Sequence, residues 1–159
     1  MAAARAFTDR YADEMNVTVL VDFENDSVRT SLEVAAALGP KLWGVRLDTS
    51  DRLADKSLVR VHGEEAAPRG VAPELVRMVR EELDAHGFPG VRIVASGGFD
   101  AARIRSFEDA RVPVDSYGVG SSLIRGANDF TADVVMVDGK PCAKVGRELR
   151  PNPRLELVR

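Results

Sequence analysis

The chain has 159 residues, 45% of them hydrophobic and 30% charged, which is typical of an ordinary globular domain and excludes an intrinsically disordered chain. Its 22 basic and 25 acidic residues give a net charge of −3 and no broad basic face, so nucleic acid is not an expected partner. No apolar run approaches the roughly 20 residues of a membrane-spanning helix, and no secretory signal opens the chain. A single cysteine, Cys142, suits a reducing compartment. We therefore expect a cytoplasmic protein with no membrane partner.

The first half of the chain predicts two strands, each followed by a helix. Residues 17–21 form a β-branched apolar run that is typical of a strand buried on both faces, and a helix is expected from Val28 to Leu38. A second strand is expected at 42–47 and its helix at 73–86. The polar stretch 51–70 between them is long for a plain connection and predicts a functional loop or lid.

The second half continues the pattern and then changes. A third strand is expected at 91–95, followed by a helix capped by Asp100, and a fourth strand begins at Val112. Residues 133–137 and 140–145 flank an Asp-Gly pair, which is a strong two-residue hairpin signal.

Alternating strands and helices predict a parallel sheet with crossover helices covering both of its faces. Four βα units are half of a closed (β/α)8 barrel. We therefore expect an α/β fold. Its first domain, residues 1–128, is a partial (β/α)8-type barrel of about four βα units. A short antiparallel hairpin of a second domain follows over residues 129–159.

Charged residues stand at the ends of two predicted strands, where parallel α/β folds gather their chemistry. Arg46 and Asp48 are two positions apart, so their side chains point the same way. Charges on a strand expected to be buried are costly to desolvate, which favours a functional role for both, although an ion pair that only satisfies itself is the alternative. Asp22 ends its strand in the same layer, or else caps the helix that follows.

Two glycine-rich segments follow the other two strands. Glycines let the backbone approach an anion closely, and backbone N–H groups can then point at it, so each segment could cradle a phosphate. The alternative is a turn that needs glycine only for a positive φ. The candidate binding residues are Ser96, Gly97, Gly98, Gly118, Gly120, Ser121 and Ser122. No third His or Cys lies at ligand spacing, so a zinc site is not expected and no residue is predicted as a metal ligand.

Four segments in order carry a resemblance to a known family. They are 42–50 (with Gly-Val-Arg-Leu-Asp-Thr), 91–99 (Ala-Ser-Gly-Gly-Phe), 112–123 (Asp-Ser-Tyr-Gly-Val-Gly-Ser) and 129–144 (Asp-Gly-Lys-Pro-Cys). Together they resemble the C-terminal portion of the nicotinate phosphoribosyltransferases. Any one motif is weak, but the ordered set, which spans most of the chain, is specific.

The resemblance implies an enzyme that joins nicotinate to phosphoribosyl pyrophosphate, forming nicotinate mononucleotide and pyrophosphate in NAD biosynthesis and salvage. It implies Mg²⁺ as cofactor, ATP as a co-substrate that is hydrolysed, and either a homodimer or a complementing N-terminal half as partner. By the same resemblance, Asp48 would stabilise the ribose cation or hold its hydroxyls and the metal. Arg46 would meet the pyridine carboxylate or a phosphate. Asp22 would orient a histidine supplied by an upstream segment.

Several alternatives remain open on the sequence. A related quinolinate or nicotinamide phosphoribosyltransferase keeps the enzyme class and changes the pyridine. A phosphate- or nucleotide-binding module without catalysis, or one half of a split enzyme, would use the same loops. A flavodoxin-like sheet of four strands is a further possibility. As half a barrel, the chain is expected to expose an apolar sheet edge and to be poorly stable or to self-associate.

Overall fold

The computed structural model describes residues 1–125 and 133–153. The chain divides into two compact units, Met1–Gly126 and Ala127–Arg159, and each is described by itself. The expected domain boundary between residues 128 and 129 lies outside the described residues, as does the start of the matched segment 129–144.

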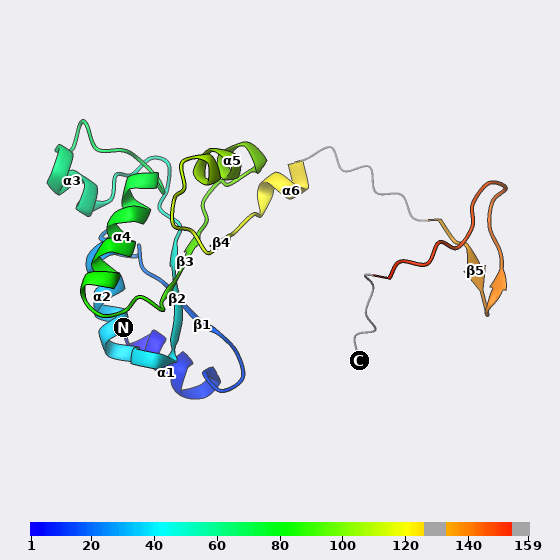
Figure 1. The fold of residues 1–159 in the computed structure, drawn as a ribbon, viewed down its shortest axis with the longest axis horizontal. Coiled ribbons are helices and arrows are strands. Elements are labelled where there is room, and N and C mark those ends of the chain that lie inside the picture. Colours follow the sequence, from blue (N-terminus) through cyan, green and yellow to red (C-terminus); the bar gives the residue numbers. More distant parts are fainter. Residues whose placement is uncertain (126–132, 154–159) are drawn as a thin grey trace. The chain divides into compact units, whose positions relative to one another are not determined.

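The first unit alternates helices and strands along the chain (Figure 1). Its elements are α1 (Ala2–Tyr11), β1 (Val17–Leu20), α2 (Ser27–Leu38), a 3-10 turn (Gly39–Lys41), β2 (Leu42–Leu47), α3 (Lys56–His62), α4 (Pro73–Ala85), β3 (Arg92–Ala95), α5 (Ala101–Asp109), β4 (Ser116–Tyr117) and α6 (Ser121–Arg125). The four strands are parallel and lie in the order β1-β2-β3-β4, which confirms the expected α/β fold. That this sheet is part of a (β/α)8-type barrel stays a prediction. Among the described helices, none has the length and apolar character to cross a bilayer.

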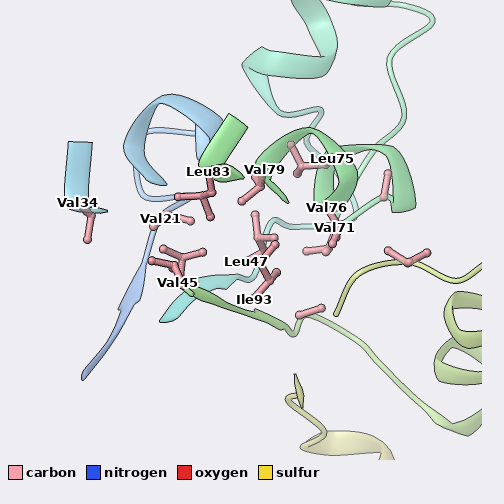
Figure 2. Close-up of a cluster of buried hydrophobic side chains, with 14 of the residues drawn as sticks. Val21, Val34, Val45, Leu47, Val71, Leu75, Val76, Val79, Leu83 and Ile93 are labelled. Atoms are coloured by element: carbon pink, nitrogen blue, oxygen red, sulfur yellow. The ribbon is translucent and has the colours of Figure 1, made fainter. Parts of the chain in front are cut away.

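One face of the sheet packs against α2 and α4, which also pack against each other (Figure 1). Figure 2 shows side chains of β2 and β3 meeting the apolar stripe of α4. The fully buried residues in this layer include Val45, Leu47, Ile93, Leu75, Val76, Val79 and Leu83. Each is worth about 1.5–3 kcal/mol relative to an exposed side chain, so this shared layer holds the helices on the sheet.

The opposite face of the sheet is not covered by the described part of this unit, so the prediction of helices on both faces is wrong. In β1, Val17 is buried, Thr18 is exposed and Leu20 is 46% exposed. The reason is topological. The strands follow one another in a single direction across the sheet, and successive right-handed crossovers in one direction place all their helices on the same face. Alternate side chains, Arg46 among them, therefore point away from the helices.

Two elements differ from their predictions in extent. The fourth strand begins at Ser116 rather than Val112, because Pro113 has no N–H to donate and the Asp115 carboxylate takes the N–H of Ile93 at 2.8 Å. The polar stretch 51–70 contains α3, whose Leu58 is fully buried, so this segment is a folded part of the unit.

The second unit contains the predicted hairpin. Strands β5 (Met136–Val137) and β6 (Lys140–Pro141) pair antiparallel around Asp138 and Gly139, whose φ angles of 50° and 73° match a type I′ turn. The hairpin is shorter than predicted. None of the described residues of this unit is buried.

Candidate functional site

The carboxyl ends of β2, β3 and β4 surround an open hollow of about 420 Å³. Val94 and Val119 contribute apolar surface to it. The hollow brings together eight of the ten predicted site residues, namely Arg46, Asp48, Ser96, Gly97, Gly98, Gly118, Gly120 and Ser121. Asp22 and Ser122 are not in its lining.

Arg46 and Asp48 form an ion pair, with Arg46 Nη2 at 2.7 Å from Asp48 Oδ2. Their side chains stay 47% and 34% exposed, so the pair faces the hollow and is not sealed inside the protein. Arg46 Nε donates to the Ser96 hydroxyl at 2.8 Å, and that hydroxyl donates to the Leu47 carbonyl at 2.9 Å. Ser96 is buried, and its hydroxyl is engaged on both sides. It therefore holds Arg46 in place, while a contact of Ser96 with a ligand stays a prediction.

Asp22 supports the end of β2 from the neighbouring strand. The register pairs Leu20 with Arg46, and Asp22 Oδ2 accepts a hydrogen bond from the Asp48 N–H at 2.9 Å. Asp22 therefore does not cap α2, which was the alternative. Burial raises the pKa of the Asp22 carboxyl above 3.8, and the nearby charge of Asp48 raises it further, although the hydrogen bond from the Asp48 N–H opposes both effects.

Turn geometry requires two glycines of the site, Gly97 and Gly98, and close approach to a neighbouring side chain requires Gly97 and Gly118. Gly97 and Gly98 have φ of +88° and +71°. A Cβ added at Gly97 would lie 3.0 Å from Asp48 Oδ1, and one added at Gly118 would lie 2.8 Å from Ser96 Cβ. The positive-φ turn therefore applies to Gly97 and Gly98, and the first loop also lies against Asp48, whereas the binding of a phosphate by these loops stays a prediction.

Four backbone N–H groups in the two loops are available to a ligand. Within the described residues, the N–H groups of Gly97, Gly98, Gly120 and Ser121 donate no hydrogen bond. The Gly118 N–H, in contrast, donates to the Ala95 carbonyl at 2.8 Å. The Ser122 hydroxyl donates to the Phe99 carbonyl at 3.0 Å and so serves the fold. These unpaired donors, two from each loop, belong to residues that line the hollow, and backbone N–H groups of this kind can bind phosphate oxygens.

Two residues that hold parts of this unit together, one of them at the site, were missed by the sequence analysis. Arg103 of α5 donates to the Gly97 carbonyl at 2.7 Å. Asp55, which is fully buried, accepts from the Ser27 and Ser57 N–H groups and so joins the starts of α2 and α3. The only local signal was for Asp55, which precedes a helix as an N-cap residue does. Its partner at Ser27 is far away in sequence.

The carboxylates present fit a magnesium ion that is shared with a substrate phosphate. Within the described ranges, no three His, Cys, Asp or Glu residues gather as a complete ligand set. Magnesium, however, is commonly held by one or two carboxylates together with substrate phosphates and water. Asp22 and Asp48 fit that donor set, because the charge of Asp48 adds to the cost of ionising Asp22 and a cation would offset that cost.

Replacing Asp22 with asparagine is expected to leave the free energy of unfolding near pH 7 unchanged or slightly higher. Asparagine can still accept from the Asp48 N–H and removes a charge that burial disfavours. Because the folded-state pKa is raised, the wild-type chain loses stability as pH rises from 3.8 through that raised pKa, and Asp22→Asn lacks this loss. Urea denaturation between pH 3.5 and 7 measures the difference; a variant destabilised by more than ~1 kcal/mol at pH 7 would contradict this view of Asp22.

Comparison with known proteins places this geometry in context. No protein-family model matches the chain. Nicotinate phosphoribosyltransferase pncB1 of Mycobacterium tuberculosis (strain H37Rv) is 36% identical over 131 residues, which are 80% of this chain and 24% of that relative. The pncB2 enzyme of the same strain is 31% identical over 147 residues, 87% of this chain and 27% of that relative. The chain thus spans about a quarter of the length of these curated relatives.

A solved structure is similar as well. The crystal structure of nicotinate-nucleotide pyrophosphorylase from Pyrococcus furiosus superposes with a TM-score of 0.63 at 32% sequence identity, covering 92% of this chain and 33% of that one. The resemblance predicted from the sequence motifs is therefore confirmed over most of the chain, and so is a fold related to that of such enzymes.

Proposed function

We propose that this chain, a relative of the nicotinate phosphoribosyltransferases, supplies the C-terminal part of such an enzyme and binds phosphoribosyl pyrophosphate in the hollow between β2, β3 and β4. The complete reaction would join nicotinate to this substrate, forming nicotinate mononucleotide and pyrophosphate with coupled ATP hydrolysis, in NAD biosynthesis. The observation that carries the proposal is the juxtaposition of a fixed Arg46–Asp48 pair with four free backbone N–H donors.

The donors suit the phosphate of a phosphorylated ribose. Two come from the Gly97–Gly98 turn and two from Gly120 and Ser121, so they approach the hollow from two loops. Their hydrogen bonds to phosphate oxygens are charge-assisted and need no side-chain rearrangement.

Asp48 is suited to the cation that develops when the anomeric bond of the ribose breaks. Its carboxylate is held by Arg46 and lies against Gly97, so it is oriented before the substrate arrives. A fixed negative charge beside a developing positive charge stabilises the transition state more than the ground state. Asp48 would also hold the ribose hydroxyls.

Arg46 has donors to spare for an anion. Its Nε is engaged by Ser96 and its Nη2 by Asp48, whereas its Nη1 has no partner among the described residues. The planar guanidinium would therefore present Nη1 to the pyridine carboxylate or to a phosphate. Asp22 and Asp48 would hold Mg²⁺, which, when bound, would neutralise charge on the pyrophosphate leaving group.

Isothermal titration of phosphoribosyl pyrophosphate with Mg²⁺ into the full chain tests the binding half of the proposal. An assay for nicotinate mononucleotide with nicotinate and ATP, repeated with quinolinate and with nicotinamide, tests the reaction and its pyridine. We expect binding that is lost in Arg46→Met. No binding by a folded chain would contradict the proposed site.

A second candidate function is phosphate binding without catalysis, alone or as one half of a split enzyme. It is favoured by one observation: the chain has unpaired N–H donors that could bind an anion, but it spans only about a quarter of the length of its relatives. Binding without turnover would support it.

A homodimer, or a complex with a complementing half, would cover two exposed apolar side chains. They are Phe23, which is 90% exposed beside Asp22, and Leu20 on the edge strand β1. Analytical ultracentrifugation of the chain measures the dimer.

A further inference from the structure

We propose that Arg103 is a positioning residue that locks the peptide between Gly97 and Gly98 in the orientation that offers its N–H group to an anion. This inference rests on the proposed phosphate binding, because an anionic ligand is bound by the N–H end of that peptide and repelled by its carbonyl end.

The guanidinium of Arg103 is held on several sides. Its Nη1 donates to the Gly97 carbonyl at 2.7 Å and its Nη2 to the Val71 carbonyl at 2.9 Å. Its Cζ lies 4.3 Å from the centre of the Phe99 ring and 5.8 Å from that of Phe107. A guanidinium group that is stacked on aromatic rings and hydrogen-bonded to two carbonyls has little freedom to move.

The turn needs such a lock because of its two glycines. Gly97 and Gly98 both adopt positive φ, and glycine populates the regions of positive and negative φ with similar ease. Rotation of the intervening peptide plane therefore meets little resistance from the residues themselves. An outside contact has to select one orientation.

The lock determines which group the ligand meets. In a trans peptide the C=O and N–H bonds point in opposite directions, so fixing the Gly97 carbonyl on Arg103 directs the Gly98 N–H away from it. A flipped peptide would turn the carbonyl oxygen toward the place of the N–H and would repel a phosphate. Arg103 is not in the lining of the hollow and both of its Nη groups donate within the fold, so Arg103 acts through the turn.

Arg80 offers a matched control at the other end of β3. Its Nη1 donates to the Val91 carbonyl at 2.6 Å and its Nη2 to the Phe88 carbonyl at 3.0 Å, so its guanidinium group also donates to two loop carbonyls. It serves the loop that leads into β3, whereas Arg103 serves the loop that leaves it. Arg80→Met should therefore disturb the fold in a comparable way and leave the anion donors in place.

The test compares Arg103→Met and Arg80→Met in the full chain by NMR and by titration with phosphoribosyl pyrophosphate and Mg²⁺. We expect Arg103→Met to show microsecond–millisecond exchange or a second signal at the Gly98 amide, with a changed Gly97 carbonyl shift. Its affinity should fall about tenfold, the loss expected for one charge-assisted hydrogen bond. Arg80→Met should keep the wild-type Gly98 signal and an affinity within about twofold.

Arg103→Lys keeps the charge and one donor, and should give an intermediate effect even if Arg103→Met does not fold. A wild-type-like Gly98 signal in the folded Arg103 variants would overturn the proposal, as would equal losses of affinity at Arg103 and Arg80. If the wild-type chain does not bind the ligand, the proposed function fails, while the Gly98 signals still decide whether Arg103 orients the peptide.

Discussion

Replacement of Asp55 with alanine is expected to lower the free energy of unfolding by about 3 kcal/mol, because three buried donors lose their acceptor together. Asp55 Oδ2 accepts from the Ser27 N–H at 2.9 Å and from the Ser27 hydroxyl at 2.7 Å, and Oδ1 accepts from the Ser57 N–H at 2.8 Å. The carboxylate is fully buried, so water cannot replace it without opening the structure. The starts of α2 and α3 would both lose their cap.

Asp100→Ala is the matched control for this prediction. Asp100 also caps a helix, α5, but through a single bond to the Arg103 N–H at 2.8 Å, and its side chain is exposed. Its loss should cost about 1 kcal/mol. Urea denaturation followed by circular dichroism measures both variants. Equal losses for Asp55→Ala and Asp100→Ala would show that the buried carboxylate does not join the two helices as described.

Replacement of Gly118 with alanine is expected to lower the affinity for phosphoribosyl pyrophosphate by more than about tenfold and stability by about 1–3 kcal/mol. The added Cβ would lie 2.8 Å from Ser96 Cβ, which is closer than two such atoms can approach. Either β4 or Ser96 must move. Since the Ser96 hydroxyl accepts from Arg46 Nε, that movement reaches the Arg46–Asp48 pair and the donors of the second loop.

Gly90→Ala controls for the loss of a loop glycine. Gly90 precedes β3, at the end of the sheet away from the hollow, and a Cβ there would meet nothing within 4 Å. We expect this variant to bind the ligand like the wild type and to unfold within about 0.5 kcal/mol of it. Calorimetric titration and thermal melting compare the two alanine variants. A Gly118→Ala variant that behaves like Gly90→Ala would disprove the steric argument.

Hydrophobic patterns in the sequence predicted the parallel strands, because each strand and helix has a local period that can be recognised along the chain. They did not predict that one face of the sheet is open. The run 17–21 is apolar at nearly every position, and such a run looks the same whether or not helices cover its second face. The direction in which strands are added decides that, and it is a property of the whole sheet.

The site was predictable to the extent that it is built at strand ends. Strand ends in a parallel sheet converge, so the Arg46–Asp48 pair and both glycine loops were expected together, and they line one hollow. The roles of Ser96 and Arg103 were not predictable. Ser96 contacts Arg46 across 50 residues, and Arg103 joins Gly97, six residues away, to Val71, 32 residues away; no local pattern encodes these combinations.

The central claim is that the two glycine loops bind the phosphate of a phosphorylated ribose, and an NMR titration of the full chain with phosphoribosyl pyrophosphate and Mg²⁺ tests it most directly. The account predicts saturable shifts of the Gly97, Gly98, Gly120 and Ser121 amides, with smaller changes at the Gly118 amide, which already has a partner. Shifts confined to other parts of a folded chain, or none at saturating ligand, would contradict it.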